Sequence, residues 1–324
     1  MTALDHNRLL VKIARLYYEE GLTQSKIGEQ LRLSRQKVQR LVRRAREQGI
    51  VQIGINPIMG IFSEFEKGLE KRFGLREAVV VETTAYGHQP TVAREVGAGA
   101  AEYLLRVLRP HDRIVISWGG SLLGVVNALS FNTKADVEDL AVIQGLGGLV
   151  DPNQEIHATE LVRRLAKALD ARAVLLSAPG VAGSPTVRNA FYDDPFVTQV
   201  LEQARKANLA VMGIGAPDPN SILVREGKIV TWAMLEDLMR QGAVGDINLR
   251  YFNRKGERVC SDLDDGVIGL TLEEIKRIGL VVGVSGGSTK LAAIRGALEG
   301  KLVHTLVTDH VTAGRLLEER GDSA

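Results

Sequence analysis

The chain has 324 residues, of which 45% are hydrophobic and 25% charged, the balance of a globular protein with a sizeable core. Its formal net charge is only +2, and its single cysteine, Cys260, excludes an intrachain disulfide framework and a cysteine-built zinc site. No apolar run reaches the roughly 18 residues of a membrane span, and the N-terminus has no signal-peptide core, so we expect a cytoplasmic protein. The length favours two domains.

Positive charge is concentrated in the first 55 residues. This segment has 11 Lys and Arg against 5 Asp and Glu, whereas the remainder has 30 against 34. Residues 35–46 alone carry six basic side chains and no acidic one. A basic head on an acidic body is typical of a nucleic-acid-binding module joined to another domain. We therefore predict a DNA-binding domain over residues 1–56 and a second domain over residues 57–324.

Three helices are predicted in the head. The first carries an apolar stripe and ends at Gly21. Thr23 is an N-cap candidate for a short second helix, and Ser34 caps a third helix that closes at Gly49. A short helix, a tight turn and a second helix with a face of long hydrogen-bond donors predict a helix-turn-helix. Residues 51–55 suit a short strand, as in a winged variant.

The third helix carries the predicted DNA contacts. Arg and Gln suit base edges because they bond bidentately to guanine and adenine. The basic residues further along the helix suit phosphates. The alternative interpretation is a basic face that is merely solvated. The residues predicted to bind DNA are Ser34, Arg35, Gln36, Lys37, Gln39, Arg40, Arg43 and Arg44.

Strands and helices alternate after an amphipathic helix at residues 61–73, which suits packing on a partner chain as well as on its own domain. The predicted strands are residues 78–81, 113–117, 140–144, 173–176, 209–213, 280–284 and 302–307. The predicted helices are residues 92–108, 122–129, 159–169, 195–206, 288–298 and 311–319. This alternation predicts an α/β domain with a mainly parallel sheet and helices on both faces. Residues 214–260 break the rhythm with strand-like runs at 222–224 and 247–252, which predicts a smaller inserted lobe.

Three glycine-bearing loops follow predicted strands: residues 117–121 (SWGGS), 144–148 (QGLGG) and 285–290 (SGGSTK). In open α/β sheets, ligands bind at the carboxyl ends of strands, and glycine lets backbone N–H groups face an anion or a hydroxyl. Turn geometry alone is the alternative explanation of any one loop. The chain has neither a Walker loop nor a dinucleotide fingerprint.

Polar residues near these loops are the remaining candidates. Asp246 can accept two hydroxyl bonds from a sugar, or it is a turn residue beside Gly245. His157 precedes a helix and suits a ligand contact or a cap. Lys290 can meet an anion or point to solvent. The predicted ligand-binding residues are Gly119, Gly120, Ser121, His157, Asp246, Gly286, Gly287 and Lys290. We assign no catalytic, metal-binding or cofactor-binding residue.

Five motifs, in this order, carry a family resemblance: GLTQSKIGEQLRLSRQKVQRLVRRAREQGIV, ISWGGSL, GDINLRYF, VVGVSGGSTKLAAIRGAL and LVTDHVTAGRLL. The chain resembles the SorC/DeoR-like family of bacterial sugar-responsive transcriptional regulators over nearly its whole length. The resemblance implies an N-terminal helix-turn-helix and a C-terminal effector domain similar to sugar-phosphate isomerases and deaminases. It also implies a homo-oligomer, commonly a tetramer.

The resemblance also implies roles for single residues. Gly119, Gly120 and Ser121 match a loop that contacts phosphate in relatives that bind sugar phosphates. Lys290 matches a lysine that lines the same pocket, and Asp246 matches an acidic position that meets ligand hydroxyls. His157 falls, with one gap, where relatives have a polar ligand contact.

Three positions depart from the family's pattern. Ser121 stands where threonine is more usual, and Thr159 replaces a common asparagine. Leu146 stands near where some phosphosugar binders have an arginine. Because arginine is the strong bidentate partner of phosphate, this last departure favours a free sugar or a polyol.

Taken together, these features predict a transcriptional regulator of a carbohydrate or polyol catabolic operon, and not an enzyme. Its expected partners are double-stranded operator DNA, a small sugar, polyol or sugar-phosphate effector, and other copies of itself. No cofactor and no membrane contact are expected. Two alternatives stay open: a sugar-phosphate isomerase-type enzyme carrying a DNA-binding domain, and a constitutive DNA-binding oligomer with no effector.

Overall fold

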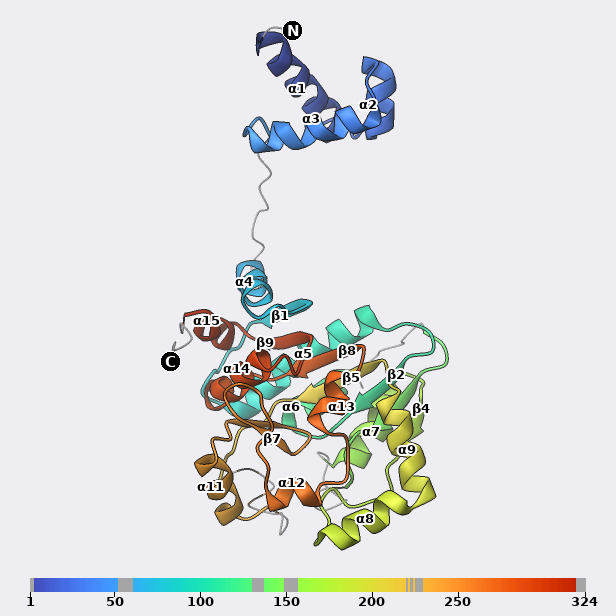
Figure 1. Cartoon of the computed structure of the whole chain (residues 1–324), viewed down its shortest axis with the longest axis vertical. Helices are drawn as coiled ribbons and strands as arrows, with labels where there is room; N and C mark the ends of the chain where they lie inside the picture. The colour runs from blue at the N-terminus through green and yellow to red at the C-terminus, as the bar shows by residue number, and fades with distance from the viewer. Residues whose placement is uncertain are drawn as a thin grey trace. The chain divides into compact units, whose positions relative to one another are not determined.

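The computed structural model describes residues 3–51, 61–129, 137–148, 157–219, 221, 224 and 230–318. The chain divides into two compact units, Met1–Ile58 and Met59–Ala324 (Figure 1). The domain boundary expected after residue 56 falls among residues outside this description and stays a prediction. Of the helices described, none is both long enough and apolar enough to cross a membrane.

The N-terminal unit contains three helices, α1 (Ala3–Tyr18), α2 (Gln24–Leu31) and α3 (Arg35–Glu47). The predicted caps are present, because the backbone N–H of Lys26 donates to Thr23 Oγ1 and that of Lys37 to Ser34 Oγ, each at 3.3 Å. The buried apolar side chains of all three helices form one core. The helix-turn-helix prediction is confirmed. Most of the predicted wing strand, residues 52–55, lies outside the described residues.

The turn between α2 and α3 depends on two backbone features. Arg32 adopts a left-handed conformation with φ 55°, and its N–H bonds back to carbonyls in the last turn of α2. A Cβ at Gly28 would lie 2.6 Å from the carbonyl oxygen of Leu33, so this close approach requires glycine. Glycine at position 28 therefore allows the tight turn between α2 and α3.

The C-terminal unit is built on a sheet of seven parallel strands. Their order across the sheet is β1 (Glu77–Val81), β9 (Thr305–Asp309), β8 (Leu280–Val284), β5 (Leu209–Gly213), β2 (Arg113–Ile116), β3 (Ala141–Gln144) and β4 (Arg172–Val174). The predicted parallel α/β architecture is confirmed. The carboxyl ends of β2, β3 and β8, from which the predicted glycine loops begin, lie at the same edge of this parallel sheet.

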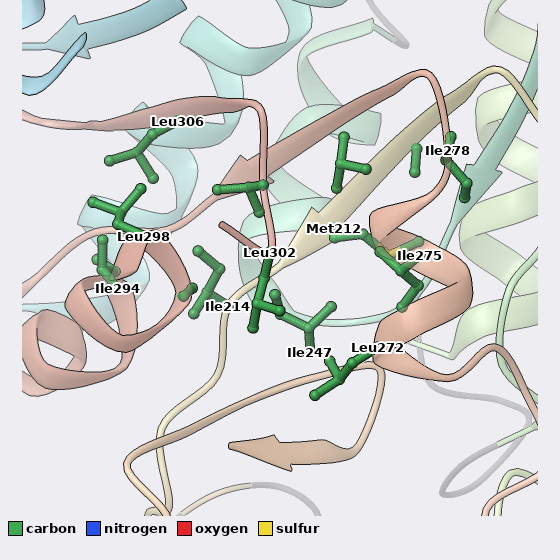
Figure 2. Close-up of a cluster of buried hydrophobic side chains, with 14 of the residues drawn as sticks. Met212, Ile214, Ile247, Leu272, Ile275, Ile278, Ile294, Leu298, Leu302 and Leu306 are labelled. Carbon is green, nitrogen blue, oxygen red and sulfur yellow. The ribbon is translucent and has the colours of Figure 1, made fainter. Parts of the chain in front are cut away.

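Strand alternation divides the interior into two cores. On β5, Ala210 and Met212 point to one face of the sheet, whereas Leu209 and Val211 point to the other. Figure 2 shows part of the first core, where strand and helix side chains meet. Helices packed on the first face are α4 (Ser63–Phe73), α9 (Pro195–Arg205), α13 (Leu272–Lys276), α14 (Leu291–Glu299) and α15 (His310–Glu318). Helices on the second face are α5 (Gln89–Val107), α6 (Gly120–Leu129) and α7 (Ala158–Ala168).

A smaller lobe with its own core interrupts the alternation between β5 and β8. It contains α11 (Trp232–Arg240), the antiparallel hairpin of β6 (Gly245–Ile247) and β7 (Arg250–Phe252), and α12 (Asp262–Gly266). The buried Arg250 ties the hairpin to α12 by donating to Asp264 Oδ1 at 3.0 Å and to the Asp264 carbonyl at 2.7 Å. A further helix, α8 (Pro185–Asp193), precedes α9 and was not predicted.

The strand-like run expected at residues 247–252 is a hairpin instead. Asn248 and Leu249 both have positive φ, 61° and 60°, so the chain reverses within the run. An apolar pattern does not reveal such a turn when neither residue is glycine. Of the other expected strand, 222–224, residues 222 and 223 lie outside the description.

Candidate functional site

The outer face of α3 presents the residues predicted to bind DNA. Val38, Leu41 and Val42 are buried against α1 and α2, whereas all eight predicted DNA-binding residues are exposed. Ser34 Oγ is used as the helix cap, and Arg43 Nε donates to Glu47 at 2.9 Å. The other basic side chains of this face have no internal partner within the described part of the chain. The helix thus offers guanidinium and amide donors to an external partner.

A cavity of about 580 Å³ opens at the carboxyl ends of β2 and β5, bounded by α5, α6 and the inserted lobe. Five of the eight predicted ligand-binding residues line it, namely Gly119, Gly120, Ser121, Asp246 and Lys290. They come from three segments of sequence more than 40 residues apart. The fold therefore brings most of the predicted site together at the sheet edge where open α/β proteins bind ligands.

The first turn of α6 forms one wall of this cavity. Gly119 has φ 125°, a conformation that L side chains rarely adopt, and α6 begins at Gly120. The Ser121 side chain is only 3% exposed, and its hydroxyl has no hydrogen-bond partner within the described residues. A buried hydroxyl without a partner costs about 1–3 kcal/mol, and a helix N-terminus favours negative charge. This wall can therefore bind a hydroxyl or an anionic oxygen.

Asp246 forms the hydrogen-bond-accepting wall. The backbone N–H of Leu249 donates to Asp246 Oδ2 at 3.2 Å, and burial raises the pKa of the carboxyl to about 6. The main chains of Asp246 and Gly215 exchange hydrogen bonds of 2.9 and 3.1 Å. A Cβ at Gly215 would overlap Asp246 Oδ1, so this carboxylate position requires glycine at 215. Sequence reasoning missed Gly215, since only the contact shows its role.

Lys290 supplies the facing positive charge. It ends the short helix η1 (Ser288–Lys290) and is half-buried in the cavity wall. Burial lowers the pKa of its ammonium group, and the charge of Asp246 partly opposes that shift. Within the described part of the chain the ammonium group has no hydrogen-bond partner. One cavity thus holds an acceptor carboxylate and a donor ammonium group.

Asn248 ties the cavity floor to three segments. Its Nδ2 donates to the carbonyls of Gly145 and Leu270, each at 3.0 Å, and its Oδ1 accepts from Ser117 Oγ at 2.8 Å. The left-handed conformation of Asn248 in the hairpin turn makes these bonds possible. The same residue lines the cavity. The sequence signal for it is weak, since only its place in the GDINLRYF motif marks it.

Aromatic and basic residues that the sequence analysis did not single out also line the cavity. Trp118 and Tyr251 add aromatic surface to the wall. Arg94 on α5 also lines the cavity, with its side chain 71% exposed and its guanidinium 3.6 Å from Glu95. Gly124 of α6 packs so closely on α5 that a Cβ there would lie 3.2 Å from Arg94 Cα. Arg94 therefore starts beside the first turns of α6, a juxtaposition that the helical pattern of α5 does not reveal.

The remaining three predicted ligand-binding residues do not line this cavity. His157 is the N-cap of α7, where its Nδ1 accepts from the Thr159 N–H at 3.3 Å. Gly287, with φ 96°, donates its N–H to Asp309 Oδ2 at 2.9 Å, and Gly286 precedes it. The two glycines shape the loop that carries Lys290. Ligand contact by these residues stays a prediction.

The departures at Leu146 and Thr159 lie elsewhere. Leu146 is fully buried in the core of the lobe and does not line the cavity. Thr159 Oγ1 donates to Gln144 Oε1 at 3.3 Å. The missing arginine therefore leaves no gap in the described cavity wall, where Arg94 and Lys290 provide cations. Among the residues described, no group of three or more His, Cys, Asp or Glu could hold a metal ion.

Comparison with known proteins gives matches over both units. A family model described as "Putative sugar-binding domain" matches residues 60–318, and the model "Sigma-70, region 4" matches residues 12–48. The first covers all seven strands of the sheet, and the second covers α2, α3 and the C-terminal part of α1. The chain therefore joins a helix-turn-helix to a domain that matches the sugar-binding model.

Full-length relatives show the same pairing. The transcriptional regulator LsrR of Enterobacter sp. (strain 638) is 33% identical over 326 residues, covering 98% of this chain and 95% of that protein. The deoxyribonucleoside regulator of Bacillus subtilis (strain 168) is 28% identical over 97% of this chain and 99% of its own length. The crystal structure of the full-length sorbitol operon regulator SorC from Klebsiella pneumoniae matches with a TM-score of 0.70 at 28% identity, over 96% of this chain and 98% of that one.

Proposed function

The chain belongs to the SorC/DeoR family of sugar-binding transcriptional regulators, and from this premise we propose that a small carbohydrate in the described cavity controls its affinity for operator DNA. The observation that carries the proposal is the buried hydroxyl of Ser121, which has no hydrogen-bond partner among the described residues and lies in a cavity that Asp246 and Lys290 also line. A polar group buried without a partner in a cavity wall is poised for an external one.

The chemistry of the cavity supports a polyhydroxylated effector. A volume of about 580 Å³ lies within the range of small-molecule sites. Asp246 would accept hydroxyl hydrogen bonds, Lys290 would donate to hydroxyl or anionic oxygens, and the aromatic faces of Trp118 and Tyr251 would cover carbon-bound hydrogens. These roles together suit a sugar or polyol.

The anionic end of a sugar phosphate would fit the first turn of α6. The helix N-terminus, the Ser121 hydroxyl and the cation of Lys290 are the groups that would bind it. A free sugar or polyol would use the same hydroxyl and leave more of the binding to Asp246. We propose these classes, sugar, polyol and sugar phosphate, as the effectors to be tested.

The DNA-binding unit would insert α3 into the major groove. Arg35, Gln36, Gln39 and Arg40 lie toward its N-terminal half, where recognition helices contact base edges. We propose that the protein acts in the cytoplasm as a homo-oligomer, a tetramer, on operators with symmetry-related half-sites upstream of a carbohydrate or polyol catabolic operon. Positive side chains on phosphates predict a steep salt dependence of this binding.

The enzyme alternative is not supported. The relatives are transcriptional regulators, which confirms the prediction that this chain is not an enzyme. The constitutive alternative explains neither the buried Ser121 hydroxyl, which no described residue partners, nor the half-buried Lys290.

The testing experiment is a thermal-shift screen with pentoses, hexoses, polyols and their phosphates. A ligand at 100 times its dissociation constant stabilises by about 2.7 kcal/mol, which shifts the melting temperature visibly. We expect at least one compound to stabilise the wild-type chain and not the Asp246→Ala variant. Silence across the panel would favour the constitutive alternative.

A further inference from the structure

Phe62, the residue that leads into α4, stacks on the imidazole of His310. Their ring centroids lie 4.9 Å apart with an interplanar angle of 12°. The Phe62 carbonyl accepts the N–H of Glu66 at 3.0 Å, so the stacked residue also holds the first turn of α4. In the sequence, residues 52–62 separate α4 from the residues described in the DNA-binding unit. Phe62 therefore follows that connection in the sequence, at the start of the described part of the C-terminal unit.

α4 is fixed along the edge of the sheet. The backbone N–H groups of Ala78 and Val80 on β1 donate to the carboxylates of Glu70 and Glu66, each at 3.0 Å. In Figure 1, α4 lies beside β1 and α15 within the C-terminal unit. A shift of the Phe62–His310 stack would therefore act on the N-terminal end of an otherwise anchored helix.

One chain of contacts leads from His310 to the cavity through α5. The N–H of Thr83 donates to His310 Nδ1 at 3.2 Å, and its hydroxyl donates to Glu95 Oε2 at 2.8 Å. Thr84 donates its hydroxyl to the other oxygen of Glu95 at 2.7 Å. Arg94, the neighbour of Glu95, lines the cavity and lies 3.6 Å from the same carboxylate.

A second chain of contacts reaches His310 from the opposite wall. The buried Asp309 precedes His310, and its Oδ2 accepts the N–H of Gly287 at 2.9 Å and the hydroxyl of Thr312 at 2.6 Å. The loop that begins at Gly287 carries Lys290 into the cavity. The two cations that line the cavity among the described residues, Arg94 and Lys290, are thus connected to the residue on which Phe62 stacks.

We propose that the Phe62–His310 stack transmits effector binding to the DNA-binding unit. An effector bound by Arg94 and Lys290 would draw Arg94 away from Glu95 and shift the Gly287 loop against Asp309. Each displacement ends at His310, and it changes how firmly Phe62 holds the start of α4. Coupling needs an element that the ligand biases between two arrangements, and this stack is that element. The role of the effector rests on the proposed function, whereas the contact network does not.

The first test uses the full chain without ligand. Hydrogen exchange of the Glu66 amide is followed in the wild type, in Glu95→Ala, in Phe62→Ala and in the double variant. We expect Glu95→Ala to speed this exchange at least about twofold, the lower end of coupling within one network, and to have no further effect once Phe62 is alanine. Independent, multiplying effects of the two substitutions would overturn the proposal.

Control variants distinguish loss of the Phe62–His310 stack from a general destabilisation of α4. Ile61→Ala changes the neighbouring side chain, which is 53% exposed, and should leave the Glu95 effect intact. Phe62→Tyr keeps the stack and should restore the coupling. His310→Phe keeps a ring but loses the acceptor for Thr83, so it should hold α4 but disconnect it from Glu95. A Glu95 effect unchanged by His310→Phe would contradict the Thr83 route.

The second test adds D-sorbitol and D-fructose 6-phosphate as probes. The melting temperature reports binding in the cavity. Hydrogen exchange of the Thr83 and Glu66 amides reports transmission through the Phe62–His310 stack. A stabilising probe should change both amides in the wild type and only Thr83 in Phe62→Ala. If a probe stabilises the chain but leaves exchange at both amides unchanged, the proposed transmission through the Phe62–His310 stack is wrong, whereas the proposed function is unaffected. If neither probe stabilises the chain, that result counts against the proposed effectors. The exchange measurements without ligand then decide alone whether the stack couples Glu95 to α4.

Discussion

Asp246 Oδ1 occupies the space that a Cβ would need at Gly215, and the two residues exchange main-chain hydrogen bonds of 2.9 and 3.1 Å. The Asp246 carboxylate, which we propose binds effector hydroxyls, therefore packs directly against the main chain of Gly215. Leu249, with its N–H on Oδ2, fixes the carboxylate from the other side. The orientation of Asp246 is therefore set by a hairpin turn and a glycine far apart in sequence.

Gly215→Ala should abolish the effector response. The added methyl group must push the Asp246 carboxylate aside, and we expect at least about a tenfold loss of effector affinity, the value of one hydrogen bond to a charged group. The matched control is Gly314→Ala on α15, because a Cβ there meets its nearest atom, Phe65 Cζ, at an ordinary 3.6 Å and Gly314 is not among the cavity-lining residues. Ligand-induced thermal shifts measure both. Equal responses from the two variants would contradict this role for Gly215.

Asp246 should make stability and effector binding depend on pH. Its carboxyl has a pKa of about 6 in the folded chain against 3.8 as the ordinary value. The folded state therefore holds the proton more tightly, and stability falls as pH rises from about 4 to 6. The fall amounts to on the order of 3 kcal/mol. Denaturant titrations of the wild type and Asp246→Asn over this window measure it, and the variant should lose this part of the slope.

Effector affinity should change in the opposite direction. The ionised carboxylate is the better acceptor for hydroxyl groups, so affinity should rise through about pH 6 in the wild type. Calorimetric titrations across this range are the check. An Asp246→Asn variant with the same pH profile would show that another group controls binding.

Ser121→Ala should weaken effector binding without destabilising the protein. The hydroxyl has no partner in the described part of the chain, so its removal should leave stability unchanged or raise it by about 1 kcal/mol. Thr308→Val is the matched control, since Thr308 Oγ1 is also buried and unpartnered but is not among the cavity-lining residues. Both variants should melt no lower than the wild type, and only Ser121→Ala should bind effector less tightly. A melting temperature that drops markedly in Ser121→Ala would assign its hydroxyl a structural role.

Arg40→Ala should weaken DNA binding and leave the effector site intact. A lost contact to a base edge costs about 1–3 kcal/mol, and a lost phosphate contact would instead reduce the salt dependence. Arg15→Ala on α1, whose side chain pairs with Glu19 at 3.1 Å on an exposed surface, serves as the control. Anisotropy titrations with genomic fragments selected by the wild-type protein give the affinities. Unchanged binding by Arg40→Ala would remove this residue from the interface.

Local chemistry let the sequence predict the helix-turn-helix and the parallel sheet. The caps at Thr23 and Ser34 and the continuous apolar run of β5 depend on neighbours in the chain. The cavity was partly predictable because strand-end loops converge in any parallel sheet, which placed Ser121 and Lys290 in one site. Such features need no knowledge of distant contacts.

Other site residues could not be predicted because they depend on the lobe. Gly215 and Asn248 act through contacts that exist only once the hairpin folds onto the ends of β2 and β3. Arg94 lies on α5, and the apolar pattern of this helix identifies only its buried face. His157 matched a ligand position by alignment, yet its ring nitrogen caps α7. Sequence spacing does not distinguish these roles.

The central claim is that a carbohydrate in the cavity changes DNA affinity. The most direct measurement titrates the complex of the full chain and operator DNA with the effector panel, using wild-type protein and Asp246→Ala side by side. We predict that at least one sugar, polyol or sugar phosphate shifts the operator affinity of the wild type, and that Asp246→Ala keeps the basal affinity but loses the shift. An operator affinity that no compound changes, or an equal shift in both proteins, would contradict the account.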